Sequence, residues 1–217
     1  MAKKSFVVFG LGEFGQSVAL TMVKNGYEVL AVDRREDRVQ EIADHVTRAV
    51  RADATDMEVL KELGLDTVDG AIVAIGSSLE AGILITIGAK ECGVPYVLAK
   101  AKDAIAEKVL RRVGADEVVF PERAMGIRIG NNLTSGNFSD IIELSSKFSM
   151  VEMTIPAGWH GKTLRQLNLL RTLGLNVIGR KQGEDVTIAL NPDEVLDPEA
   201  VYIVVGKNES LEKVKEN

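Results

Sequence analysis

The chain has 217 residues, of which 46% are hydrophobic, and a formal net charge of -6, so it can form one or two packed cores but lacks the basic surface that DNA or RNA binding requires. Its longest apolar region, residues 71–89, is interrupted by glycine, serine and glutamate, and its first residues lack the apolar core of a signal peptide, so we expect neither a membrane span nor secretion. The single cysteine, Cys92, excludes an internal disulfide and is typical of a reducing cytoplasm.

The first predicted elements are a strand, a glycine turn and a helix. An apolar run predicts a buried parallel strand over 5–9. Gly10, Gly12 and Gly15 follow it as a complete GxGxxG pattern. The first glycine of such a pattern permits the turn, the second leaves room for a pyrophosphate, and the third lets the next helix pack on the strand. The unpaired amides at the start of that helix favour an anion.

A second apolar strand, predicted over 28–32, ends at Asp33. A carboxylate at this point accepts hydrogen bonds from the ribose hydroxyls of a nucleotide, and it disfavours the 2'-phosphate of NADP. Strand, turn, helix, strand and acid thus occur in the order that nucleotide binding requires. The alternative is a Rossmann-like fold that binds no ligand.

The following elements continue the alternation of strands and helices that builds a parallel sheet. The further strands are predicted over 47–52, 70–75, 96–100 and 117–120, and the helices over 13–25, 36–44, 56–63, 78–92, 103–113 and 122–134. This pattern predicts an α/β domain with a Rossmann-like, doubly wound sheet, whose ligands lie beyond the carboxyl ends of the strands. Asp53 and Ser77 lie at such ends, but each is equally well explained as a helix cap.

A polar, turn-rich segment over Asn131–Asn137 indicates a linker. The short alternating runs beyond it lie near 140–155, 175–180, 185–190 and 200–205, with one helical stretch near 162–170. They predict a small α+β domain, and we place the two domains at 1–138 and 139–217. A domain as small as the second needs a partner, such as a second copy, to cover its core.

A dinucleotide fold makes a dehydrogenase the first enzyme class to test, but the sequence offers it few catalytic residues. The two histidines, His45 and His160, fall at a helix end and in a turn, away from the predicted nucleotide site. Tyr96 and Lys100 have the YxxxK spacing of short-chain reductases, yet on a strand the two side chains stand roughly 13 Å apart. The residues favour a non-catalytic nucleotide-binding module, and a small NAD-dependent oxidoreductase is the alternative.

Several segments together resemble the RCK or TrkA-type regulatory subunits of potassium uptake systems, including KtrA-like proteins. They are VVFGLGEFGQSVA, EVLAVDRRED, RADATD, AIVAIGSSLEA, YVLAKAKD and RRVGADEVVFPERAMG. The resemblance implies an RCK-N (TrkA-N) nucleotide-binding domain followed by an RCK-C (TrkA-C) domain for regulation and dimerisation. It also implies a cytoplasmic, non-catalytic subunit at the inner face of the membrane, which gates a membrane potassium-translocating partner as a homodimer assembled into an octameric ring.

The resemblance implies ATP and ADP, or NAD and NADH, as ligands, and it assigns their contacts. The glycines would contact the phosphates, with Lys100 nearby, while Asp33 would bind the ribose and Arg34 would flank the adenine. The complete predicted nucleotide site is Gly10, Gly12, Glu13, Phe14, Gly15, Asp33, Arg34, Asp53, Ala54, Thr55, Ile75, Gly76, Ser77 and Lys100. Helix 122–134 would cross between the subunits of a dimer, and the alternative is an ordinary amphipathic core helix.

Glu13 departs from the family pattern, because ATP-sensing relatives carry an arginine there that meets the terminal phosphate of the nucleotide on the neighbouring subunit. A carboxylate repels that phosphate, so either the discrimination of ATP is weaker or the ligand is ADP, AMP or NAD(H).

Two further sites are implied by the resemblance. Glu122 would help to hold a divalent cation such as Mg²⁺ at the dimer interface, and its alternative is a first-turn acid that favours the helix dipole. Cyclic di-AMP would lie between two C-terminal domains, and its alternative is simple dimer packing. The residues implied for this second ligand are Leu164, Leu167, Arg171, Asn176, Val177, Ile178 and Pro192.

Overall fold

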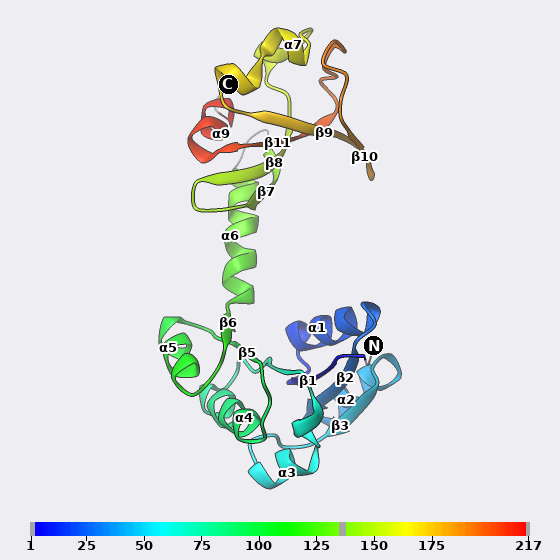
Figure 1. Cartoon of the computed structure of the whole chain (residues 1–217), viewed down its shortest axis with the longest axis vertical. Helices are drawn as coiled ribbons and strands as arrows, with labels where there is room; N and C mark the ends of the chain where they lie inside the picture. The colour runs from blue at the N-terminus through cyan, green and yellow to red at the C-terminus, as the bar shows by residue number, and fades with distance from the viewer. Residues whose placement is uncertain (1–2, 135–137, 216–217) are drawn as a thin grey trace. The chain divides into compact units, whose positions relative to one another are not determined.

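The computed structural model describes residues 3–134 and 138–215 (Figure 1). Contacts between α-carbons divide the chain into two compact units, Met1–Glu122 and Arg123–Asn217. This division falls within helix α6, Pro121–Thr134. The domain boundary between residues 138 and 139 stays a prediction. Within the described ranges, no helix is long and apolar enough to cross a membrane.

The first unit is a six-stranded parallel sheet with helices on both faces. Its strands are β1 Ser5–Phe9, β2 Glu28–Asp33, β3 Arg48–Arg51, β4 Gly70–Val73, β5 Val97–Lys100 and β6 Glu117–Val119. Its helices are α1 Glu13–Lys24, α2 Glu36–Ile42, α3 Met57–Glu62, α4 Leu79–Glu91 and α5 Ala104–Arg112, with short 3-10 turns η1 Ala43–His45 and η2 Leu65–Thr67. The strand order β3-β2-β1-β4-β5-β6 confirms the predicted Rossmann-like sheet, and the chain reverses direction between β1 and β4.

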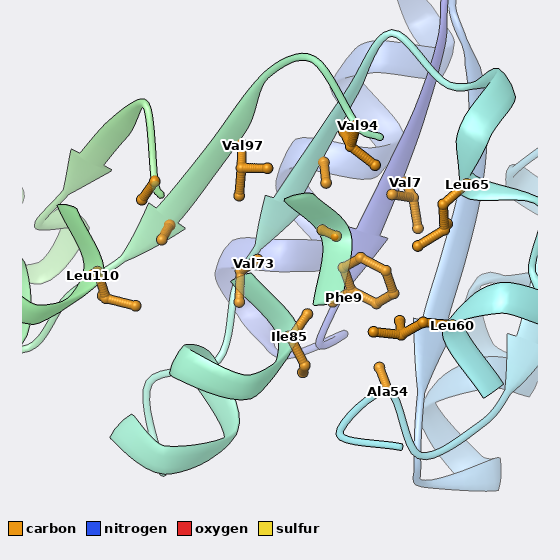
Figure 2. Packing of buried hydrophobic residues seen from close by; sticks show 14 of the residues in the cluster. Val7, Phe9, Ala54, Leu60, Leu65, Val73, Ile85, Val94, Val97 and Leu110 are labelled. Atoms are coloured by element: carbon orange, nitrogen blue, oxygen red, sulfur yellow. The ribbon is translucent and has the colours of Figure 1, made fainter. Parts of the chain in front are cut away.

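Successive residues of β1 point to opposite faces of the sheet and so separate two cores. Val7 and Phe9 pack with Leu60 of α3 and Ile85 of α4, and the Phe9 ring lies close to both (Figure 2). Val8 packs on the other face, against α1 and α2. Burial on both faces is the reason that β1 is continuously apolar from Phe6 to Phe9 and not alternating.

Asp116, which directly precedes β6, links the starts of β5 and β6 through hydrogen bonds. Its Oδ2 accepts hydrogen bonds from the Val97 amide at 2.7 Å and from the Lys90 Nζ at 2.8 Å. The hydrogen bond from the Lys90 ammonium is the main reason that the pKa of the Asp116 carboxyl is lowered. A lowered pKa means that the folded state prefers the ionised carboxylate, which stabilises the fold above the unfolded-state pKa.

We therefore expect Asp116→Asn to lower the free energy of unfolding by about 1 kcal/mol at pH 7, a value reduced by the partial exposure of the pair. The difference from the wild type should shrink as the pH falls below about 4, where the wild-type carboxylate takes up its proton. Urea unfolding at pH 7 and at pH 3 measures both values. An exposed control, Asp44→Asn, should leave the free energy of unfolding unchanged, whereas an equal loss in Asp116→Asn at both pH values would contradict the expectation.

The second unit is a five-stranded antiparallel sheet with short helices, which confirms the predicted α+β class. Its strands, β7 Phe138–Glu143, β8 Phe148–Thr154, β9 Asn176–Gln182, β10 Asp185–Ile188 and β11 Val201–Lys207, lie in the order β10-β9-β11-β8-β7. Its short helices are η3 Ala157–Trp159, α7 Leu164–Leu167, α8 Leu169–Thr172 and α9 Asn208–Lys215. Helix α9 was not predicted, because its sequence contains only two apolar residues, Leu211 and Val214, both of which are buried in the core.

The linker predicted over Asn131–Asn137 is wrong for residues 131–134, which form the last turn of α6. Arg128 and Asn132 both donate hydrogen bonds from this helix to the Asp140 carboxylate of β7. Asn132, one of the polar residues that indicated a loop, is thus used in a tertiary hydrogen bond, and the Thr134 hydroxyl donates back to carbonyl oxygens of the same helix. The rest of the predicted linker, residues 135–137, lies outside the described residues.

Candidate nucleotide-binding site

The three glycines of the motif lie in different surroundings. Gly10 has a φ of +90°, and a Cβ there would lie 2.9 Å from the Ile75 Cγ1. A Cβ on Gly15 would lie 1.9 Å from the Gly10 carbonyl oxygen, which is a direct clash between backbone atoms. A Cβ on Gly12 would meet just one atom within 4 Å in the described part of the chain, the Arg38 Nη1 at 4.0 Å. The fold therefore requires Gly10 and Gly15, while Gly12 is the one that leaves open space.

Asp33 is buried at the end of β2, and its side chain is 6% exposed. Its Oδ2 accepts the Leu11 amide at 2.7 Å, and its Oδ1 accepts the Arg35 amide at 2.9 Å. The carboxylate is thus fixed between the glycine turn and the start of α2. Each carboxylate oxygen can accept a second hydrogen bond, so a sugar hydroxyl is still compatible with this geometry.

Four of the predicted residues come together around one ammonium group. The Lys100 side chain, 13% exposed, forms an ion pair with Glu122 at the start of α6. Its Nζ lies 5.7 Å from the centre of the Phe14 ring and would be 3.2 Å from a Cβ on Gly76. The hydrogen bond that Lys100 donates to Glu122 is the main reason that the pKa of the Glu122 carboxyl is lowered. The carboxyl end of β5 thus carries a shielded cation beside the helix that the glycine turn begins.

In the loops after β3 and β4, the residues that cap the next helices are not the residues predicted to bind the nucleotide. Asp56 caps α3 and Ser78 caps α4, so the alternative in which Asp53 and Ser77 are the caps is wrong. The Asp53 Oδ1 instead accepts hydrogen bonds from the Thr55 hydroxyl at 2.7 Å and the Thr55 amide at 3.1 Å, and the hydroxyl lowers the pKa of Asp53. Ser77 is exposed. Their contacts with a nucleotide stay predictions.

Three other predicted site residues differ in their exposure. Glu13, the first residue of α1, and Arg34, directly after β2, are exposed, whereas Ala54 is buried against the core. Exposed charges at strand and helix ends are accessible to a ligand or to a second copy.

The metal prediction at Glu122 finds no support within one copy of the chain. Among the described residues, no group of three histidine, cysteine, aspartate or glutamate side chains is placed to hold a metal ion. The partner of Glu122 is the Lys100 ammonium, which repels a cation. The described residues of a single chain therefore do not form a Mg²⁺ site, and a metal site at Glu122 stays a prediction that requires further ligands.

Tyr96 and Lys100 do not form the pair that a reductase uses. The Tyr96 hydroxyl donates a hydrogen bond to Glu117 at 2.6 Å, which is the main reason that the pKa of Tyr96 is raised to about 12. Lys100 lies at the other end of β5 and pairs with Glu122. A phenol with this pKa is poorly suited to proton transfer at neutral pH.

The residues predicted for a second ligand fall into two groups. Three pack against the core of the second unit, namely Leu164, Leu167 and Val177. The others keep their side chains at least partly at the surface, namely Arg171, Asn176, Ile178 and Pro192. A small surface pocket lies beside Leu164, lined in part by Arg180 and Tyr202, and includes none of the other six predicted residues. Binding of cyclic di-AMP stays a prediction.

Helix α6 has no buried residue within the described chain. Its large apolar side chains are 51% to 82% exposed, and they are Met125, Ile127, Ile129 and Leu133. The interpretation of this segment as an ordinary core helix is therefore wrong for the single chain. Met125, Ile129 and Leu133 recur every four residues and so share one face, and an exposed apolar helix face of this kind marks an interaction surface.

Comparisons with known proteins agree with this architecture. Residues 6–121 match the family model of the TrkA-N domain, and residues 150–217 match that of the TrkA-C domain. The Ktr system potassium uptake protein C of Bacillus subtilis (strain 168) is 42% identical over 204 residues, which cover 94% of this chain and 92% of that protein. The Ktr system potassium uptake protein A of Vibrio alginolyticus is 39% identical over 208 residues, which cover 96% and 94%.

Solved structures share the fold at low sequence identity. The RCK domain of GsuK aligns with a TM-score of 0.69 and 18% identity over 99% of this chain and 47% of that chain, and the GsuK channel bound to NAD aligns equally well over 40% of its length. This chain thus spans less than half the length of those proteins. The matches to both domain models and to the Ktr proteins show that the chain belongs to the TrkA family of proteins with TrkA-N and TrkA-C domains.

Proposed function

We propose that this chain is a cytoplasmic, non-catalytic regulatory subunit of a Ktr- or Trk-type potassium uptake system, controlled by adenine nucleotides. The observation that carries the proposal is the convergence, at the carboxyl ends of the parallel strands, of an open glycine turn, a fixed carboxylate and a shielded ammonium. This edge of a doubly wound sheet is where ligands bind. The potassium uptake role is supported by the relatives, which are named Ktr system potassium uptake proteins.

The ligands we propose are ATP and ADP, or NAD and NADH. Solved structures of GsuK, which share this fold, are bound to NAD and to ADP, and this supports an adenine nucleotide as the ligand of this chain. Glu13 is the first residue of α1 and is exposed, so a terminal phosphate that approaches it from a neighbouring copy meets a carboxylate. The preference for ATP over ADP should therefore be weaker than in relatives with an arginine at this position.

The partner surfaces we propose are a second copy of the chain at α6 and a membrane potassium-translocating subunit. The exposed apolar face of α6 supports the first of these, because a second molecule that packs on this face would remove its apolar side chains from water. Dimers of this kind would form a ring, octameric as the family resemblance implies. A nucleotide shifts the equilibrium between two shapes of such a ring only if it binds one shape more tightly than the other. The size of the shift is set by the difference between the two affinities.

The proposal is tested by potassium flux into vesicles that contain the Ktr- or Trk-type membrane subunit of the same cell, with and without this chain. We expect the chain to bind the membrane subunit and to make the flux depend on whether ATP, ADP or NADH is present. Flux that is independent of nucleotide, together with no complex between the two proteins, would contradict the proposal. Steady turnover of NADH with a panel of metabolites would instead support the oxidoreductase alternative.

A further inference from the structure

A cation that sequence reasoning did not single out reaches the glycine turn. Arg38 lies in α2, and its Nη1 is 3.5 Å from the Asp33 Oδ2. The same atom is 4.0 Å from the place where a Cβ on Gly12 would lie, and apart from Gly12 and its chain neighbours no other described atom is within 4 Å of that place. A group bound over Gly12 would therefore meet the Arg38 guanidinium first.

The Arg38 guanidinium retains most of its hydrogen-bonding capacity. A guanidinium carries five N–H donors. Within the described residues, the Arg38 side chain donates one hydrogen bond, from Nη1 to the Asp33 Oδ2, and its length of 3.5 Å is at the upper limit for a hydrogen bond. Nearby Arg35, in contrast, donates two hydrogen bonds to Asp37, and Arg51 donates to a backbone carbonyl oxygen. Arg38 and exposed Arg34 thus both keep donors available for a ligand at this edge, and Arg38 is the one that lies beside Gly12.

The Asp33 carboxylate does not depend on Arg38 for its satisfaction. Both of its oxygens already accept backbone amides at 2.7 Å and 2.9 Å. The Arg38 side chain is 37% exposed, so its charge lies at the rim of the site and not in the core. If Arg38 only neutralised the buried Asp33 carboxylate, the position of its guanidinium beside Gly12 would therefore have no explanation.

We propose that Arg38 binds a phosphate group of the nucleotide over Gly12 and makes the site selective for ligands with a pyrophosphate, such as nucleoside diphosphates and dinucleotides. The inference rests on the function proposed above. The second glycine of the motif is the one that lets the backbone approach a pyrophosphate. A guanidinium matches two phosphate oxygens with two parallel donors. Its charge also offsets the repulsion between that phosphate and the neighbouring Asp33 carboxylate.

The alternative group for Arg38 to bind is a phosphate on the ribose 2'-oxygen, as in NADPH. Asp33 opposes it, because its carboxylate is fixed by two amides where that phosphate would lie. We therefore assign Arg38 to the pyrophosphate, and NADPH serves as a separate arm of the test.

The test measures the affinity of the full-length protein and of Arg38→Gln for adenosine, ADP, NADH and NADPH by calorimetry or by competition. We expect Arg38→Gln to bind ADP and NADH about tenfold more weakly, as loss of one charge-assisted phosphate contact implies. Its affinity for adenosine should stay within about twofold of the wild type, because adenosine has no phosphate to contact. The control is Arg111→Gln on α5, a surface arginine that pairs with Glu107, and it should bind all four ligands like the wild type.

Each other outcome has a distinct meaning. Equal weakening of adenosine and ADP would show that Arg38 acts through Asp33 and the ribose, which overturns the inference. Weakening confined to NADPH would place the guanidinium at a 2'-phosphate and would overturn it as well. Unchanged ADP binding in Arg38→Gln defeats the inference but leaves the proposed function standing, whereas a wild type that binds none of the four ligands defeats both.

Discussion

Gly15→Ala is expected to cost the first unit about 3 kcal/mol or more of unfolding free energy, the upper end of what overpacking a well-packed site costs. The added Cβ would lie 1.9 Å from the Gly10 carbonyl oxygen and 3.2 Å from the Ala74 Cβ. The first of these atoms belongs to the backbone of the turn, so no side chain can rotate to relieve the clash. Helix α1 must then move away from β1, and the packing of the helix on the sheet is lost.

Urea or thermal unfolding of the full chain measures this loss, and Gly12→Ala is the matched control. Gly12 is the N-cap of α1 and has open space, so alanine there should cost at most about 1 kcal/mol. The two variants should also differ in binding: Gly12→Ala should fold but bind ADP more weakly, because its methyl group occupies the space proposed for phosphate. Equal stability of Gly15→Ala and the wild type would show that the tight approach of α1 to the turn is not needed.

Asp33→Ala is expected to weaken both the fold and the ligand site. It leaves the buried Leu11 amide without its acceptor, which costs about 1 to 3 kcal/mol. Water can replace the second bond, to the amide of exposed Arg35, at less cost. In addition, the proposed ribose contact is lost, so ADP, NADH and adenosine should all bind at least about tenfold more weakly, since hydrogen bonds to charged groups contribute about 1.5 to 3 kcal/mol.

Asp33→Asn separates these two effects. Its amide oxygen can still accept the Leu11 amide, so its unfolding free energy should lie closer to the wild type than that of Asp33→Ala. Its nucleotide affinity should remain low, because a neutral amide is a weaker acceptor for two hydroxyls. Thermal unfolding and titration with ADP of the two variants give the comparison. If Asp33→Ala unfolds at the wild-type temperature and binds ADP normally, the acid has neither role.

The local features of the first unit followed from the sequence with little error. The apolar runs of β1 and β2, the glycine spacing and the acid at the end of β2 are set by neighbours within a few residues, and these signals do not depend on the rest of the fold. The cap positions needed the structure, because Asp53, Asp56, Ser77 and Ser78 are all plausible caps by composition. Backbone conformation at each position decides which one caps the helix.

The sequence by itself determined the Rossmann-like order of elements and the small second domain, because hydrophobic periodicity and turn chemistry are local properties. The resemblance to a known family came separately, from segments such as VVFGLGEFGQSVA and RRVGADEVVFPERAMG. Only the tertiary structure decided which partner each charged side chain has. Lys100 pairs with Glu122, Asp33 accepts the Leu11 amide, and the Arg38 guanidinium lies beside Gly12. These partners are 22, 22 and 26 residues apart in the chain, counted as 122 − 100, 33 − 11 and 38 − 12. Such pairs depend on how parallel strands place their carboxyl ends along one edge of the sheet, which no local pattern encodes.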